Sequence, residues 1–383
     1  MYYTRTNRTK LNHLLNYNQS FGIHDVSAMV GYEEETYNYR ETNVSKLGLT
    51  DAAVNDLDAA TTPYSTAGYG TEYAARSVFG RANYAYKSRY LLEFNLRYDG
   101  SSRFAPDYRW GAFPSFSAGW RMNEESWLKP VQWLTNLKLR ASWGKLGNNA
   151  IGNYDWQSVY SAANYSTGQA LTSGIAITSI ANAALTWEET AVTNAGLDFG
   201  FFNQRLTISP EFYINRSSNL LLSAKLPTSA GYDSMVINAG ETENKGIDLT
   251  INSTNIMTKN FTWNTSVTLS HNKNSVKQLT GEEVQLWEAN FGYSQNTHII
   301  GINQPLGQMY GYITEGLYQV SDFDYDATTQ TYTLKDGIPY AGDKANVKPG
   351  MWKFKNVDGS EDNKITEEDK TVIGNAYPKF YGG

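Results

Sequence analysis

The sequence predicts an all-β fold: an antiparallel transmembrane β-barrel, seen in part, with long extracellular loops. Three observations support it. Stretches alternate between apolar and polar residues, connections alternate between short and long, and the 383 residues include 28 Tyr, 10 Trp and 15 Phe. Tyr and Trp favour positions that are apolar on one side and wet on the other, as at a membrane interface. On composition alone, a soluble all-β protein that uses Tyr in its strands is the alternative.

The clearest alternation lies at residues 90–98. Leu92, Phe94 and Leu96 fall on one parity, while Glu93, Asn95 and Arg97 fall on the other. A period of two indicates a strand with one apolar and one polar face. An apolar outer face opposite a polar inner face is typical of a membrane barrel wall around a wet interior. Residues 116–122 repeat the pattern.

Other alternating stretches predict further strands. They lie at residues 10–17, 26–32, 78–86, 137–143, 197–201, 206–214, 247–251 and 261–269. Pro210 cannot donate a hydrogen bond to the ladder, so we expect a bulge there. A short helical turn is expected within 124–135, and weaker strands near 309–318 and 380.

The connections have a systematic order of lengths. Short ones near residues 20, 87 and 203 and medium ones at 124–136 and 253–260 alternate with long polar loops. The long loops are expected at 36–75, 145–190, 216–240 and 273–300. Outer-membrane barrels have this asymmetry, with the short turns on the periplasmic side. No repeat of 20–50 residues is visible, which argues against a propeller or a solenoid.

Several other classes are disfavoured by composition. The net charge is −6 with no basic block, so we expect no nucleic-acid partner, and no Cys is present to form disulfides or thiolate sites. Four scattered His residues have no metal-ligand spacing, and the acidic pairs Glu124-Glu125 and Glu188-Glu189 would point to opposite faces of a strand. Neither pair can form a glycosidase dyad, so an enzyme is not expected. No apolar run of about 18 residues predicts a transmembrane helix.

A resemblance to a known family rests on motifs that follow one another along the chain. The strongest are Arg97-Tyr-Asp-Gly-Ser-Ser-Arg-Phe104 and Arg109-Trp-Gly-Ala-Phe-Pro-Ser-Phe-Ser-Ala-Gly-Trp-Arg121, followed by Leu137-Lys-Leu-Arg-Ala-Ser-Trp-Gly144, Asn194-Ala-Gly-Leu-Asp-Phe-Gly200 and Asn244-Lys-Gly-Ile-Asp248. This ordered set resembles the SusC/RagA-type TonB-dependent outer-membrane receptors, and it spans nearly the whole chain.

The resemblance implies that residues 1–383 are an internal part of the receptor β-barrel domain. The family's signal peptide, N-terminal extension, TonB box and plug have no counterpart here, and the family continues past Phe380. It implies TonB-driven import across the bacterial outer membrane of oligosaccharides, or sometimes peptides, with a SusD-like surface lipoprotein. TonB would act through the missing N-terminal region. The alternatives are a passive outer-membrane barrel or adhesin, and a soluble all-β glycan-binding protein.

An acidic loop near the end of the chain predicts a calcium site. Residues 358–369 place oxygen donors at the spacing of an EF-hand-type loop. The candidate ligands are Asp358, Ser360, Asp362, the backbone carbonyl of Lys364, and Asp369. Asn363 replaces the usual Gly at the sixth position but can reach the left-handed conformation. A solvated acidic turn is the other interpretation. No other cofactor is expected.

Aromatic residues in the expected long loops have two interpretations. They are Tyr154, Trp156, Tyr160, Tyr165, Trp287 and Tyr293. Their rings could stack on sugars or pack against a partner, or they could fold the loops on themselves.

Overall fold

A computed structural model describes most of the chain. The described residues are 2–49, 51, 53–54, 56–168, 170–232, 234–279, 284–288 and 296–383. They form two compact units, one of Met1–His271 with Gly382–Gly383 and one of Asn272–Tyr381. Among the described residues, no helix is long and apolar enough to cross a membrane.

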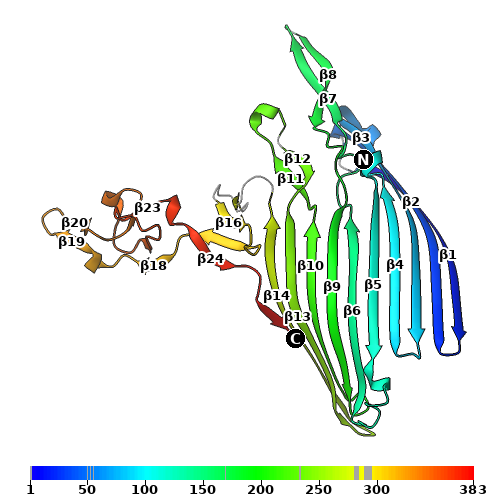
Figure 1. The fold of residues 1–383 in the computed structure, drawn as a ribbon. Helices are drawn as coiled ribbons and strands as arrows, with labels where there is room; N and C mark the ends of the chain where they lie inside the picture. The colour runs from blue at the N-terminus through cyan, green and yellow to red at the C-terminus, as the bar shows by residue number, and fades with distance from the viewer. Residues whose placement is uncertain are drawn as a thin grey trace. The chain divides into compact units, whose positions relative to one another are not determined.

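One antiparallel sheet dominates the first unit (Figure 1). Its strands follow one another in the order β1-β2-β3-β4-β5-β6-β9-β10-β13-β14-β25, so each pairs with its predecessor in the sheet. They are β1 (Tyr2–Phe21), β2 (His24–Leu49), β3 (Ala60–Tyr86), β4 (Tyr90–Ser101), β5 (Trp110–Arg121), β6 (Leu134–Asn148), β9 (Glu188–Phe201), β10 (Leu206–Ser218), β13 (Glu241–Met257), β14 (Thr262–Gln278) and β25 (Phe380–Gly382). The predicted all-β antiparallel fold is confirmed.

The connections at one end of the strands are short, as predicted, and we call this end the short-turn edge. β1 turns into β2 through Gly22 and Ile23, and β3 turns into β4 at Lys87 and Ser88. Lys87 and Ser88 have φ angles of 53° and 51°, the left-handed pair that suits a tight hairpin turn. The expected helical turn between β5 and β6 is a 3₁₀ turn, η3 (Met122–Glu124), placed slightly earlier than predicted.

The connections at the opposite end of the strands, which we call the long-loop edge, are longer, and two contain hairpins of their own (Figure 1). β7 (Val159–Thr167) pairs with β8 (Ala170–Ser179) between β6 and β9, and β11 (Leu221–Lys225) pairs with β12 (Ser234–Asn238) between β10 and β13. Three 3₁₀ turns lie at this edge: η1 (Leu57–Ala59), η2 (Pro106–Tyr108) and η4 (Thr228–Ala230). The alternation of short and long connections is therefore confirmed.

Two expectations about the strands were wrong. Residues 36–75 are not mainly a loop, because β2 and β3 continue as a paired ladder to Leu49 and Ala60. This part of the ladder is polar on both faces, so it lacks the alternation that predicts a half-buried strand. Pro210 also makes no bulge: it stays in register with Leu249, and the register to β9 is unchanged on either side of it.

The second unit consists of short elements around a small core. β15 (Val284–Glu288), β16 (Asn296–Gly301), β17 (Gln308–Gly311) and β24 (Thr371–Asn375) form one sheet. The remaining elements are β18 (Thr314–Leu317), η5 (Val320–Asp322), β19 (Phe323–Asp326), β20 (Thr331–Leu334), β21 (Tyr340–Ala341), η6 (Lys344–Asn346), β22 (Trp352–Phe354), β23 (Lys364–Ile365) and η7 (Glu367–Asp369). Its buried core is Tyr318, Phe323, Leu334 and Val347. The predicted strands near 309–318 and 380 are present.

Candidate functional site on the large sheet

The large sheet has an apolar face that is not buried. In β4, Leu92, Phe94 and Leu96 are 44%, 49% and 42% exposed. Across the ladder Phe94 pairs with Phe116 and Leu96 with Pro114, so the same face of β5 is also apolar. Large apolar side chains in a continuous exposed patch mark a surface that meets something other than water. We call this the outer face.

Aromatic pairs border this apolar band at both ends. Tyr90 stacks on Trp120 at 6.3 Å, and Tyr98 stacks on Trp110 at 5.0 Å. Eight residues separate Tyr90 from Tyr98, which is about 27 Å along an extended strand. A tilt of about 40° reduces this to a height of about 20 Å, close to the apolar band of outer-membrane barrels, which is about 25 Å tall.

The aromatic border at the short-turn edge continues across the strands. His24 lies 5.1 Å from Tyr86, whose ring lies 6.1 Å from Tyr90. Glu125 fixes this border, because its carboxylate accepts hydrogen bonds from the Tyr90 hydroxyl at 2.7 Å and from Trp120 Nε1 at 3.2 Å. Such a belt is characteristic of a membrane–water interface.

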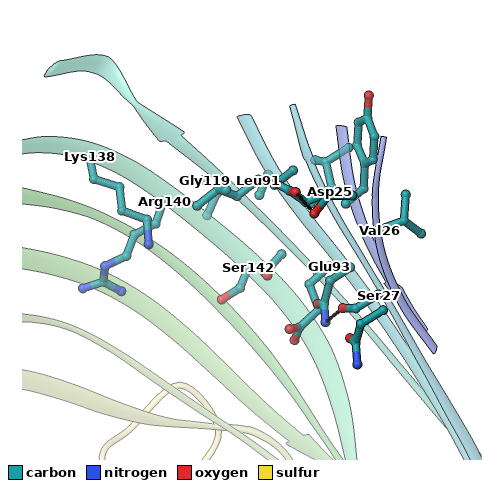
Figure 2. A pocket seen from close by; sticks show the side chains of 18 of the residues that line it. Asp25, Val26, Ser27, Leu91, Glu93, Gly119, Lys138, Arg140 and Ser142 are labelled. Carbon is teal, nitrogen blue, oxygen red and sulfur yellow. Dashed lines mark hydrogen bonds between the residues drawn. The ribbon is translucent and has the colours of Figure 1, made fainter. Parts of the chain in front are cut away.

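The opposite, inner face of the sheet is polar and contains a cavity of about 620 Å³ (Figure 2). Side chains from β1 to β6 and from β9 line it, and most have hydroxyl, amide or charged groups. The polar lining residues are Asn18, Gln19, Ser20, Asp25, Ser27, Asn83, Glu93, Ser117, Lys138, Arg140, Ser142 and Asn194. In Figure 2 the labelled side chains come from several neighbouring strands of the curved sheet.

The strand register arranges part of this lining in one row. Residues that are directly paired point to the same face. Successive pairs therefore form one row across eight neighbouring strands: Asn18, Ser27, Asn83, Glu93, Ser117, Ser142, Asn194 and Tyr213. Asn83 Nδ2 donates to Ser27 Oγ at 3.0 Å. The Oδ1 atom of Asn194 is buried and has no partner among the described residues. The row therefore offers hydrogen-bonding groups to whatever occupies the interior.

Ion pairs join the inner side chains of different strands. Arg140 on β6 bonds Asp198 on β9 at 3.3 Å and Glu211 on β10 at 2.6 Å. Its guanidinium lies over Gly196, where a Cβ atom would come within 2.8 Å of Cζ. Sequence analysis missed this network. The signal was available, because Arg140, Asp198 and Glu211 all fall on the polar parity of predicted strands.

A second charged group lies on the inner side of β2 and β4. Arg97 Nε bonds Asp99 at 2.7 Å, its Nη2 donates to Ser77 Oγ at 2.7 Å, and Glu33 lies 3.4 Å away. Lys10 on β1 adds a bond to Glu33 at 3.1 Å. Bonds of this kind tie neighbouring strands together and leave a wet, charge-balanced wall.

The signature motif around residue 100 has a packing role at the long-loop edge. Phe104 and Leu185 are fully buried, and Phe113 and Trp187 complete their cluster. Trp187 Nε1 donates to the carbonyl oxygen of Arg109 at 3.0 Å, which ties the loop before β9 to the start of β5. We call this cluster the loop-base core.

The predicted calcium loop is occupied by its own hydrogen bonds. Oδ1 of Asp369 accepts from the amides of Val357 at 2.7 Å and Asp358 at 3.3 Å, and Oδ2 accepts from the amide of Thr366 at 2.8 Å. Asp369 is fully buried. Asn363 has a φ of 55°, the left-handed conformation that was expected.

The other candidate ligands of this loop bond one another. Asp362 Oδ1 accepts from Ser360 Oγ and from the amide of Lys364, both at 2.9 Å, and Asp358 Oδ1 accepts from the amide of Ser360 at 2.8 Å. Among the residues that the structure describes, no group of three acidic or His side chains is placed to hold a metal. Calcium binding stays a prediction. Calorimetric titration of the gene's full-length product with calcium tests it, and the absence of any binding heat would contradict it.

The loop aromatics divide between packing and exposure. Trp156 packs against the loop-base core, and the Tyr154 hydroxyl accepts a hydrogen bond from the amide of Glu72 at 3.0 Å. Tyr160 and Tyr165 on β7 are 58% and 62% exposed. The side chain of Trp287 and the whole of Tyr293 lie outside the described residues.

Comparisons with known proteins agree with this architecture. A TonB-dependent receptor of Formosa agariphila is 32% identical over 388 residues, covering 100% of this chain and 37% of the relative. TonB-dependent receptor SusC of Bacteroides thetaiotaomicron is 38% identical over 271 residues, covering 69% of this chain and 27% of the relative. The chain thus spans little more than a third of the length of the first relative and about a quarter of the second.

A solved structure has the same fold. The structure of the RagAB peptide transporter superposes with a TM-score of 0.80 at 24% identity, covering 100% of this chain and 39% of that chain. The family model described as TonB dependent receptor-like, beta-barrel matches residues 1–352. With its exposed apolar band, its polar inner wall and this match, the chain belongs to the TonB-dependent receptor-like β-barrel family.

Proposed function

We propose that these residues form part of the wall and the outer loops of a TonB-dependent importer in the bacterial outer membrane. The single observation that supports this most is the division of the sheet into two exposed faces. Phe94 on the outer face is 49% exposed within an aromatic-bordered apolar band, and its neighbours Glu93 and Asn95 face the polar inner wall. Lipid solvates the first face and water or protein the second.

The inner wall is suited to passage and not to a reaction. Its hydrogen-bonding groups are distributed along rows, and several of its charged groups are paired within the wall, as Arg140 is with Asp198 and Glu211. A surface of many weak, equivalent contacts can hold a polar solute without trapping it. We therefore propose no enzymatic role.

The cargo that we propose is an oligosaccharide or a peptide. The resemblance to SusC/RagA-type receptors favours oligosaccharides, whereas the structurally similar RagAB complex is a peptide transporter. We propose that a SusD-like surface lipoprotein delivers the cargo from outside. TonB would supply the driving force through a region that precedes the barrel in the receptors of this family.

Uptake by living cells tests the proposal. Cells that lack the gene should stop accumulating one class of fluorescent oligomers, either oligosaccharides or peptides, and the gene's full-length product should restore it. Deletion of TonB should abolish the same uptake. Uptake that persists without TonB would support the passive barrel instead. If loss of the gene changes only the attachment of cells to surfaces, the adhesin alternative is supported.

The soluble glycan-binding alternative has its own test. It requires the outer face to contact water or a dry protein interior. The protein would then behave as a folded monomer without detergent. We expect it to aggregate instead, because Leu92, Phe94 and Leu96 are exposed as one continuous patch.

A further inference from the structure

A second cavity lies at the long-loop end of the strands. It has a volume of about 340 Å³, and it lies among β2, β3 and the loops that follow β4 and β6. This is the small end of the range for ligand pockets, about 300–1,000 Å³. A cavity of this size suits one small polar unit and not a long chain.

The strand register places most of the strand residues that line this cavity on the outer parity, and Tyr73 on the inner one. Its lining residues Thr36 and Asn38 pair with Ala74 and Glu72, and they share the parity of the outer-face residues of β2 and β3. Asn38 follows Tyr32 by six residues, which is about 20 Å along the strand. Tyr32 is level with the aromatic pair of Tyr98 and Trp110, because Tyr32 pairs with Val78, and Val78 pairs with Tyr98. The cavity is therefore beyond the apolar band, on the side of the long loops.

Several lining groups have unused hydrogen-bonding capacity. The side chains of Thr36, Asn38 and Gln157 make no hydrogen bond within the described part of the chain. The Nε atom of Arg109 is buried and also lacks a partner there. Tyr154 uses its hydroxyl oxygen to accept from the Glu72 amide, so its own O–H proton is available to a ligand.

The walls of the cavity are held in place by bonds that do not use these groups. Arg103 lies over the ring of Tyr73 at 4.8 Å, and its guanidinium donates to Asn153 Oδ1 and to the carbonyl oxygen of Asn149, both at 3.0 Å. Trp156 is packed against the loop-base core. The site is thus built before a ligand arrives.

We propose that this cavity, at the long-loop end of the strands, binds a single neutral saccharide unit. Each sugar hydroxyl is both a donor and an acceptor, and the lining supplies amides that are both, a carboxylate on Glu72 and a guanidinium on Arg109. The rings of Tyr154 and Trp156 supply the apolar contact that a sugar ring needs. A lipid chain would leave the polar groups unsatisfied, and an anion attracted by Arg109 would meet the charge of Glu72.

Two sources can supply this chemistry. The saccharide belongs either to a nutrient glycan held at the surface or to the polysaccharide of the cell's own outer leaflet. The inference does not depend on the proposed import, because binding to this cavity requires neither TonB nor uptake. Binding can be measured on purified protein, and its failure leaves the uptake experiment unaffected.

Binding measured on the gene's full-length product in detergent tests the inference. The probes are the methyl glycosides of glucose, galactose and mannose, and the core oligosaccharide released from lipopolysaccharide of the producing cells. Saturation-transfer NMR reports contact, and titration gives the affinity. Free glycosides binding indicates a nutrient, whereas binding of the core oligosaccharide alone indicates the cell's own surface.

Two variants and one control make the result decisive. Asn38→Ala and Thr36→Val each remove one hydrogen-bonding group from the lining, and we expect each to weaken binding about fivefold. Arg40→Gln is the matched control, because Arg40 is exposed, shares the face of Asn38 and pairs with Gly70 outside the lining. It should leave binding unchanged. No binding by any probe, or equal losses in all three variants, would overturn the inference.

Discussion

Two phenylalanines ten residues apart show how differently the two ends of the sheet are stabilised. Phe94 in the apolar band is 49% exposed, whereas Phe104 in the loop-base core is fully buried by Phe113, Leu185 and Trp187. Inside the membrane the solvent itself is apolar, so the strands need no dry protein centre there. Beyond the membrane water returns, and the loops have to build a conventional core.

The contrast also explains where polar side chains are used. In the band, backbone ladders join neighbouring strands, and inner ion pairs such as that of Arg140 with Glu211 link the strands further. At the loop edge, side chains bond to backbone, as Trp187 does to Arg109. Within the second unit, Asp369 bonds in the same way to three backbone amides. Such bonds fix irregular chain segments that have no ladder of their own.

The largest expected effect breaks the loop-base core. Phe104→Ala leaves a cavity in a fully buried site and should cost about 3–5 kcal/mol of unfolding free energy. Phe94→Ala is the matched control, and it should cost less than half as much, because lipid fills the space. Urea unfolding of the gene's full-length product in lipid vesicles measures both. Equal losses would mean that the two phenylalanines are in the same kind of environment.

The next effect separates the two faces of one strand. Phe116→Arg places a charge on the outer face and should cost about 2–4 kcal/mol near the middle of the membrane. Ser117→Arg is on the inner face beside Glu93, to which Ser117 is directly paired, and should be well tolerated. The yield of folded protein in outer membranes distinguishes the two variants. A tolerated Phe116→Arg would argue against lipid on that face.

Acid should weaken the second unit through Asp369. Burial raises the pKa of this carboxyl, but hydrogen bonds from the amides of Thr366, Val357 and Asp358 lower it, and the net pKa is below the ordinary value. A lowered pKa stabilises the fold above about pH 4, and that stability is lost as the pH falls through the folded value. Asp369→Asn should remove this pH dependence.

The same variant has a measurable cost near neutral pH. Asp369→Asn brings an NH₂ group against buried amides and should cost about 1–3 kcal/mol. Scanning calorimetry of both proteins across the acidic range measures the cost and the pH dependence together. Parallel curves for the two proteins would show that another group is responsible.

The smallest effect concerns the aromatic border. A Cβ atom at Gly100 would come within 2.8 Å of the Trp110 ring, so Gly100→Ala should displace the ring from Tyr98 and cost about 1 kcal/mol. Gly80→Ala, on the same outer face, meets only Met29 O at 3.4 Å and should be neutral. Tryptophan fluorescence and thermal unfolding report the shift. No difference between the two variants would exclude the stack as a source of stability.

Most of the wall could be predicted from the sequence, because a strand with one apolar and one polar face requires strict alternation of apolar and polar residues. Leu92 to Tyr98 shows it clearly, and the tight turn at Lys87 and Ser88 followed from the pattern on either side. The extension of β2 and β3 could not be predicted in this way. Both of its faces are polar, so only the pairing itself, such as Tyr37 with Tyr73, indicates a strand.

The site was less predictable than the fold. The inner parity could be assigned, yet the bond of Arg140 to Glu211 depends on which strands are neighbours, and β7 and β8 intervene in the sequence between β6 and β9. The loop-base core joins residues 104 and 185, far apart in the chain. Pro210 was misjudged because the pairing to β9 skips Ser209 and Pro210 without an inserted residue, so the missing donor leaves a gap in the ladder and does not shift its register.

The accessibility of single positions along β4 tests the central claim most directly. The 383 residues contain no Cys. Single cysteines at 91–97 can therefore be labelled with nitroxides in the full-length protein in lipid, once any Cys outside these residues has been replaced by Ser. Oxygen dissolved in lipid should relax the labels at 92, 94 and 96, and a water-soluble nickel complex should relax those at 93, 95 and 97. A flat profile, or the opposite order, would contradict a sheet with lipid on one side and a polar interior on the other.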